Sequence, residues 1–160
     1  MGLLADIGAT YRGPRSVMRR HLAIGQREDR ALMYLGLACI LIFIAQWPRL
    51  RREALFDEAI PFDVRVGGAM LAWIFIVPLL LYAIAALAHI AARALGGQGT
   101  WYSARLALFW SLLAASPLWL LNGLVAGFAG SGPQMMLTGA AALGVFLVFW
   151  ALCMIEAEKP

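Results

Sequence analysis

The side chains of this chain that are best suited to metal ligation or acid–base chemistry are its two histidines. His89 lies inside a long apolar run, whereas His21 lies in a basic segment near the N-terminus. A haem held by two histidines needs both at the same depth in the membrane, and only one lies in an apolar run. We therefore expect no haem, metal or other cofactor. Tyr82 precedes His89 by about two helical turns on the same face, so the two residues mark a candidate polar site. There we expect His89 to hydrogen-bond a neighbouring helix or a lipid headgroup.

The apolar runs contain no Asp, Glu, Lys or Arg. Charged groups inside a membrane domain mark proton relays and ion pathways, so their absence disfavours proton-coupled transporters and pumps. It also disfavours intramembrane aspartyl or metal-dependent proteases, which need paired carboxylates or His/Glu metal ligands. The chain also has no HExxH, GxSxG or P-loop pattern. Cys39 and Cys153 lie inside apolar runs without CxxC spacing, and a buried cysteine behaves as a small apolar residue. We therefore expect no enzymatic activity.

Three kinds of residue inside the apolar runs predict helix packing. Asn122 is the most polar group deep in a run, and it needs a hydrogen-bond partner there. Gly123 and Gly127 form a GxxxG pair, which allows two helix backbones to approach closely. Pro78 lies within the second run and is expected to kink its helix. Packing is the leading interpretation of Asn122, and ligand binding is the alternative.

The elements that position these side chains are membrane-spanning helices. The 160 residues are 62% hydrophobic and 14% charged, against about 45–50% and about 25% in soluble domains. A soluble domain of this length could not bury so much apolar surface. Four runs approach the ~20 residues that a helix needs to cross a bilayer, namely 31–47, 66–92, 106–128 and 135–155.

The runs do not alternate as strands would, and backbone groups in lipid must be paired within the chain. We therefore expect an all-α bundle of four spans, with a glycine- and proline-rich turn between the last two. An N-terminal segment, 1–30, precedes the membrane domain, 31–155, and a short tail, 156–160, follows it.

The distribution of basic residues predicts the orientation of the spans, because cytoplasmic loops are enriched in Lys and Arg. Four spans place both termini on one side. That side holds nine basic residues, namely Arg12, Arg15, Arg19, Arg20, Arg27, Arg30, Arg93, Arg105 and Lys159. The other side holds four, namely Arg49, Arg51, Arg52 and Arg65.

We therefore expect both termini in the cytoplasm. Lys159 is the only lysine, and this preference for arginine, together with abundant Ala and Gly, suggests a GC-rich bacterial genome and hence a bacterial inner membrane. The basic residues are explained by topology, so no nucleic acid is expected as a partner.

The segment before the first span is basic and amphipathic. Pro14 suits the first position of a helix, and an apolar stripe follows it at helical spacing, formed by Val17, Met18, His21, Leu22 and Gly25. Arginines lie away from this stripe, and the candidate surface residues are Arg15, Arg19, Arg20 and Arg27. This pattern is typical of a helix that lies on an anionic leaflet. Two interpretations remain open: a collar that sets topology, or a docking surface for the membrane or a partner protein.

One region resembles a known family. The residues Gly96-Gly97-Gln98-Gly99-Thr100-Trp101-Tyr102 lead into a run that carries Ser116-Pro117 midway. This order resembles the bacterial members of the Yip domain family, relatives of the eukaryotic Ypt/Rab-interacting membrane proteins. Family members usually have five spans, and four are expected here. The resemblance implies a non-enzymatic membrane protein that acts through helix packing and partner proteins, but the GTPase partners of the eukaryotic members do not carry over.

The leading hypothesis is therefore a Yip-type scaffold or partner-binding protein, whose partners are the lipid bilayer and other membrane proteins or a second copy of itself. An accessory subunit of a larger respiratory or photosynthetic complex is the first alternative. A small transporter or channel is the second, and the charge-free runs disfavour it.

Overall fold

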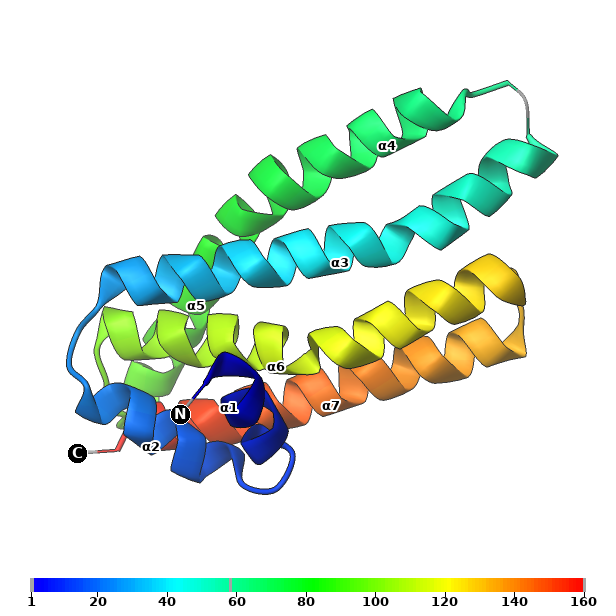
Figure 1. The fold of residues 1–160 in the computed structure, drawn as a ribbon. Helices are drawn as coiled ribbons and strands as arrows, with labels where there is room; N and C mark the ends of the chain where they lie inside the picture. The colour runs from blue at the N-terminus through cyan, green and yellow to red at the C-terminus, as the bar shows by residue number, and fades with distance from the viewer. Residues whose placement is uncertain (1, 58, 160) are drawn as a thin grey trace.

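The computed structural model describes residues 2–57 and 59–159, which form a bundle of helices (Figure 1). Residues 1, 58 and 160 belong to the expected N-terminal segment, the loop after the first span and the C-terminal tail, and they lie outside the described residues. The described residues contain no strand. The elements in chain order are α1 (Leu3–Thr10), α2 (Pro14–Ala23), α3 (Glu28–Phe56), α4 (Phe62–Leu71), the π-helical turn η1 (Ala72–Ile76), α5 (Val77–Ala94), α6 (Trp101–Phe128) and α7 (Pro133–Ala157).

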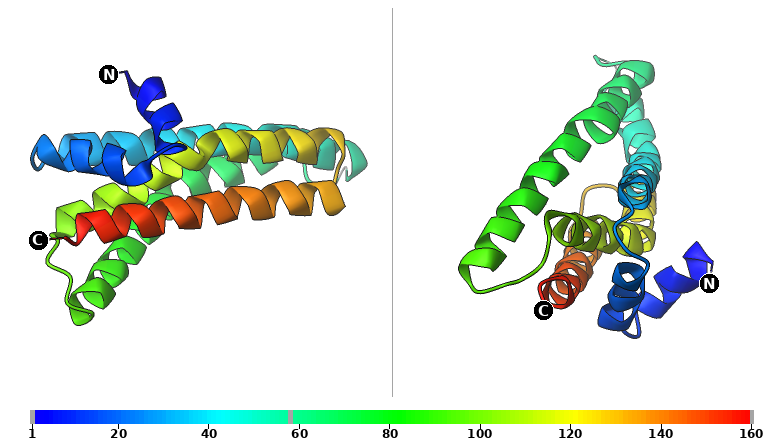
Figure 2. Two further views of the ribbon diagram at one scale, coloured as in Figure 1. Left: turned by 90° about the horizontal axis from the view of Figure 1, so that it is seen from below. Right: turned by 90° about the vertical axis from the view of Figure 1, so that its left-hand side faces the viewer.

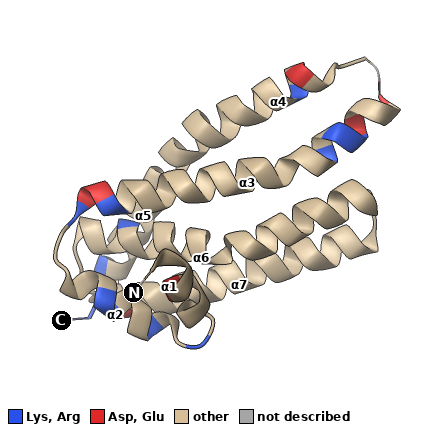
Figure 3. Cartoon of the chain, in the orientation of Figure 1, with Lys and Arg blue, Asp and Glu red and all other residues tan. Residues whose placement is uncertain are grey.

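Within the described residues, four helical stretches are long and apolar enough to cross a membrane, namely Glu28–Phe56, Phe62–Ala94, Trp101–Phe128 and Pro133–Ala157. The second stretch combines α4, η1 and α5. The predicted all-α bundle of four spans is therefore confirmed, and the chain is a multi-pass membrane protein. Charged residues gather at the two ends of the bundle (Figure 3). We call the end that carries α1, α2 and the C-terminus the terminal end, and the end that carries the α3–α4 and α6–α7 turns the distal end.

Helix α6 lies at the centre of the bundle, where α3, α5 and α7 pack around it (Figure 2). Its Phe109 and Trp110 are fully buried. A helix that is apolar all round is stable only when protein or lipid covers every side. By contrast, only 11% of the most apolar window of Phe62–Ala94 is buried within the protein. That span therefore leaves most of its surface to lipid or to another protein.

Helices α3 and α6 approach each other closely at the two glycines of the GxxxG pair. A Cβ atom at Gly123 would collide with the carbonyl group of Ala45, and a Cβ atom at Gly127 would collide with Pro48. Helix α3 continues through Pro48, whereas the predicted first span, 31–47, ends before this proline. A proline inside a helix removes one backbone hydrogen bond, and here the proline lies against Gly127 of α6.

Pro78 lies at the start of α5, directly after the π-helical turn η1. Because proline has no N–H group, the carbonyl of Ile74 loses its usual partner four residues along the chain. A π-helical turn widens the backbone locally and is a common form of helix irregularity. At the position where a kink is expected from Pro78, the structure has the π-helical turn η1 directly before the proline.

The N-terminal helices pack against the bundle, with α2 beside α7 and α1 against α6 (Figure 2). Val17 and Met18 of α2 are fully buried in the core that also contains Trp110. The apolar stripe of α2 therefore lies against the bundle, and its basic side chains lie on the opposite, exposed side. The physical reason is that lipid tails and apolar side chains are equally good surroundings for such a stripe, and the bundle offers apolar side chains at this end.

Candidate functional site

His89 connects three segments at the terminal end. Its side chain is fully buried, and its Nδ1 atom lies 3.0 Å from the Oε1 atom of Glu158, just beyond α7. Its ring lies 4.6 Å from the ring of Trp101, at the start of α6. The other ring nitrogen, Nε2, is buried and has no hydrogen-bond partner among the described residues. The partner expected for His89 on a neighbouring element is thus the carboxylate of Glu158.

The glycine-rich turn between α5 and α6 lies against the same carboxylate. The N–H group of Gly99 donates to Oε2 of Glu158 at 2.9 Å, and the N–H group of Gln98 donates to its main-chain carbonyl at 3.0 Å. A Cβ atom at Gly97 would lie 2.6 Å from Oε2 of Glu158. These glycines are needed because the backbone of the turn approaches the end of α7 so closely. Thr100 and Ser103 then begin α6 with a capping box.

Tyr82 has different neighbours from His89, although both lie on the side of α5 that faces α6. Its ring packs edge-on against Phe109 at 5.0 Å, and the guanidinium carbon of Arg105 lies 5.8 Å from its ring centroid. Arg105 in turn pairs with Glu28 at the start of α3. Tyr82 therefore links α5 to α6 rather than forming one polar site with His89.

Asn122 has the hydrogen-bond partner that its position requires. Its Oδ1 atom accepts a hydrogen bond from the hydroxyl of Thr138 in α7 at 2.7 Å. The neighbouring Gly123 and Gly127 lie against α3. This part of α6 therefore contacts α7 through Asn122 and α3 through the two glycines. Asn122 also lines a small cavity between α3 and α6. Both interpretations of this residue, helix packing and ligand binding, are therefore compatible with its position.

A second buried histidine cluster holds α1 and α2 in place. The Nδ1 atom of His21 lies 3.3 Å from the hydroxyl of Tyr34 in α3, and its ring lies 4.4 Å from that of Trp110. The indole N–H of Trp110 donates to the hydroxyl of Thr10 at 3.2 Å. Burial lowers the pKa of His21 below its usual value. Sequence reasoning placed His21 on an apolar stripe but could not name these partners, because they lie on other helices.

The four arginines predicted as a surface are all exposed. Arg19 forms an ion pair with Glu156 at 2.9 Å, and Arg20 forms one with Asp6 at the same distance. Arg27 pairs with Asp29 at the start of α3. The structure brings these arginines and Arg15 to the outward side of α2 and the turn that follows it.

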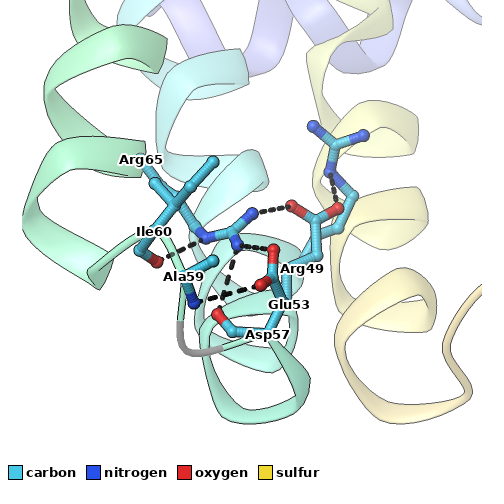
Figure 4. A network of polar contacts seen from close by, with 6 residues as sticks. All are labelled: Arg49, Glu53, Asp57, Ala59, Ile60 and Arg65. Atoms are coloured by element: carbon cyan, nitrogen blue, oxygen red, sulfur yellow. Dashed lines mark hydrogen bonds and ion pairs between the residues drawn. The ribbon is translucent and has the colours of Figure 1, made fainter.

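At the distal end, Arg65 holds the turn between α3 and α4 together (Figure 4). Its guanidinium donates to the carboxylate of Asp57 at 2.6 Å and to the carbonyl of Ile60 at 3.0 Å. It also lies 3.6 Å from the carboxylate of Glu53, which Arg49 approaches at 3.6 Å from the other side. The hydrogen bond from Arg65 lowers the pKa of Asp57 below its ordinary value.

Sequence reasoning named none of these distal residues as a site. The available signal was the group of arginines directly after the first span, on the side where the charge rule expects few. In the structure, Arg49 pairs with Glu53 and Arg65 pairs with Asp57. These arginines therefore have a local structural role, which a count of basic residues on each side of the membrane does not show.

Fold and sites together define a class: a multi-pass, all-α membrane protein with charged clusters at both ends of its bundle. Among the residues that the structure describes, no group of three or more His, Cys, Asp or Glu side chains is placed to hold a metal ion. Comparison with protein families, with curated proteins and with solved structures finds no match for this chain. Its function must therefore be inferred from its own residues.

Proposed function

We propose that this chain is a non-enzymatic membrane scaffold that binds a partner protein through the outward face of α2. The observation that carries the proposal is that one side of this helix is buried and apolar, while the other is exposed and basic. Val17 and Met18 are fully buried in the core, while Arg15 and Arg19 are exposed. Because the apolar side is fixed to the bundle, the helix presents its basic side chains on one defined face, and pre-organisation of this kind lowers the entropic cost of binding.

The partner of such a face carries acidic groups. The Arg19 side chain is 70% exposed although it pairs with Glu156, whose own side chain is only 6% exposed and also pairs with Lys159. A carboxylate on another protein can therefore compete for these guanidiniums. Several arginines on one face also steer an acidic partner toward it. This proposal agrees with the partner-binding role that the resemblance to the Yip family implies.

Site-specific crosslinking tests the proposal in membranes. A photoreactive side chain at Ser16, which is exposed beside the arginines, should capture one defined protein. The same side chain at Leu87, which is 67% exposed on α5, is the matched control, because it faces the surroundings of the bundle far from α2. Capture of lipid alone at Ser16, or of the same protein at both positions, would count against the proposal.

Removal of the charges provides the second arm of this experiment. Replacing Arg15, Arg19, Arg20 and Arg27 by Gln should abolish the crosslink at Ser16. Glutamine is preferable to glutamate here, because a glutamate at position 19 would repel Glu156 and disrupt the contact between α2 and α7. The variant must keep its insertion and orientation, since the same arginines contribute to topology. An unchanged crosslink in a correctly inserted variant would show that these arginines do not recognise the partner.

A second candidate function is that of a subunit in a larger membrane assembly, and the second span favours it. Gly67 and Gly68 of α4 are exposed, and a Cβ atom at either would meet no atom within 4 Å. Small residues on a helix surface allow close approach of another helix. Gly68→Leu should then reduce the size of the complex on native gels, whereas Leu71→Val on the same exposed helix should not. Equal sizes for both variants would remove this candidate.

A further inference from the structure

The distal end contains a cleft of about 600 Å³ between α3, the start of α4 and the α6–α7 turn. We call it the distal cleft. It lies where α3 and α4 diverge from α6 and α7 (Figure 1). Its lining includes Arg49, Arg52, Arg65, Phe56, Ser131 and Met135. A volume of this size falls within the range of small-molecule sites, about 300–1,000 Å³.

Arg52 is held firmly at the wall of the distal cleft. Its Nη1 atom donates to the carbonyls of Gly127 and Phe128 at 3.3 and 3.2 Å, which are the open carbonyls at the end of α6. Its guanidinium carbon lies 5.2 Å from the ring centroid of Phe56. These contacts hold the guanidinium, and its remaining N–H groups have no acceptor among the described residues.

The charge of the cleft favours an anion. The lining holds three guanidiniums and two carboxylates, those of Glu53 and Asp57. Arg65 already binds Asp57 at 2.6 Å and is only 13% exposed. Arg49 approaches Glu53 at 3.6 Å, but its Nε atom is buried without a hydrogen-bond partner among the described residues. The pairs of Arg65 with Asp57 and of Arg49 with Glu53 balance two of the three charges, which leaves the charge of Arg52 in excess. Arg49 and Arg52 are therefore the guanidiniums that we expect to meet a ligand, because the only ion pair of Arg49 among the described residues is the longer one, made by its Nε atom.

A smaller cavity of about 180 Å³ continues from Arg49 toward the middle of the bundle. It is lined by Gln46, Arg49, Trp119 and Asn122, among others. The indole N–H of Trp119 is buried and has no hydrogen-bond partner among the described residues. An unpaired buried donor costs about 1–3 kcal/mol, so Trp119 and Arg49 together favour a ligand that supplies acceptor oxygens.

An apolar groove of about 580 Å³ begins beside the cleft on the surface of α7. Pro133, Met136, Gly139 and Ala140 line it. Met135 lines the cleft, the inner cavity and this groove, so the three spaces meet at one side chain. A ligand that occupies all of them has an anionic, oxygen-rich group attached to an apolar chain.

We infer that the distal cleft binds the phosphate headgroup of an anionic phospholipid, with one acyl chain in the groove on α7. Arginine binds phosphate oxygens through several parallel N–H groups, and Arg49 and Arg52 supply such groups at the end of the apolar spans. The groove on α7 is the feature that distinguishes a lipid from free phosphate, because inorganic phosphate has no chain to place there. This site lies at the opposite end of the bundle from the partner-binding face proposed above.

Native mass spectrometry of the detergent-solubilised chain tests the inference. Dioleoyl phosphatidylglycerol should bind at least about tenfold more tightly than dioleoyl phosphatidylcholine, a difference of about 1.4 kcal/mol. Arg49→Gln should reduce that preference about tenfold. Arg51→Gln is the matched control, because it removes the same charge from the same helix but Arg51 does not line the cleft. Ala140→Phe, which fills the groove from an exposed position, should weaken both lipids and leave the chain folded.

Three results would overturn the assignment. The first is equal binding of the two lipids by the unmodified chain. The second is an equal effect of Arg49→Gln and Arg51→Gln in variants that keep the melting temperature of the parent. The third is binding of inorganic phosphate that Arg49→Gln abolishes and Ala140→Phe leaves unchanged, with no lipid retained, because the cleft would then be a site for free phosphate.

Discussion

The Nδ1 atom of His89 lies 3.0 Å from the carboxylate of Glu158, which connects α5 to the end of α7. The same carboxylate accepts the N–H group of Gly99 at 2.9 Å, so one side chain joins two helices and the turn between α5 and α6. Glu158 itself is only 9% exposed. A buried carboxylate needs partners of this kind, because an unpaired one would be strongly destabilising. The terminal end of the bundle is therefore held together by a residue close to the C-terminus.

Glu158→Ala should loosen the glycine-rich turn. The N–H group of Gly99 loses an acceptor, and a hydrogen bond to a charged group contributes about 1.5–3 kcal/mol. Hydrogen exchange at this amide should therefore accelerate by about tenfold or more. Glu158→Gln keeps an acceptor oxygen and should show a smaller increase. Equal exchange in Glu158→Ala and in the unmodified chain would mean that the turn is ordered by other contacts.

Gly123→Ile should destabilise the bundle, because its side chain would collide with the carbonyl of Ala45. Overpacking of this kind costs about 1–3 kcal/mol, and here the obstacle is backbone, which cannot move aside easily. The melting temperature in detergent should fall. Leu124→Ile changes the neighbouring residue, which is 48% exposed on the outer side of α6, and should leave the melting temperature nearly unchanged. Similar melting of both variants would show that the approach of α3 and α6 does not depend on the glycine.

The docking of α1 and α2 should weaken at acidic pH. Burial lowers the pKa of His21 below its ordinary value of about 6.5, Asp6 opposes this shift, and Arg30 and Arg20 add to it. Between the lowered pKa and 6.5, the unfolded or undocked segment binds more protons than the docked one, so stability rises with pH. The stabilisation is complete above about pH 6.5 and is lost as the pH falls through the lowered value. The protection factors of the α2 amides, which compare each exchange rate with that of an unstructured amide at the same pH, should therefore fall between pH 7.5 and pH 5.

His21→Gln provides the control for this pH effect. Glutamine does not titrate, so the protection factors of the α2 amides should lose most of their dependence on pH in this range. Its absolute stability should also fall, because the contacts of the imidazole with Tyr34 and Trp110 are removed. An unchanged pH dependence in His21→Gln would assign the effect to another group.

The sequence predicted the parts of this structure that depend on local pattern. Four apolar runs predict four spans because only helices of that length satisfy the backbone in lipid. Gly123 and Gly127 predict a close contact because spacing places them on one face, although the partner helix α3 could not be named. The predicted helix boundaries are less accurate, because α3 continues through Pro48, which lies against Gly127.

The remaining features depend on contacts between distant residues. The apolar stripe of α2 was visible in the sequence, but periodicity does not tell whether protein or lipid covers a stripe. Glu158 was not predicted as a partner of His89, because nothing local indicates a pairing between the second span and the C-terminal tail. Arg52 and Trp119 lie on different helices, and the cavities that they line share Arg49, Ala126 and Met135.

Ser131 and Lys159 should lie on opposite sides of the membrane. The helix between them, Pro133–Ala157, has 25 residues and is about 37 Å long at 1.5 Å per residue, which exceeds the ~30 Å hydrocarbon core. In a background where Cys39 and Cys153 are replaced by Ala, a membrane-impermeant maleimide should label Ser131→Cys in intact bacterial cells. Lys159→Cys should react only after lysis, because the basic residues predict that both termini are cytoplasmic. Both positions are exposed, so the absence of a reaction reports sidedness rather than burial. Labelling of Lys159→Cys alone in intact cells would invert the orientation, and labelling of both would contradict the crossing by α7.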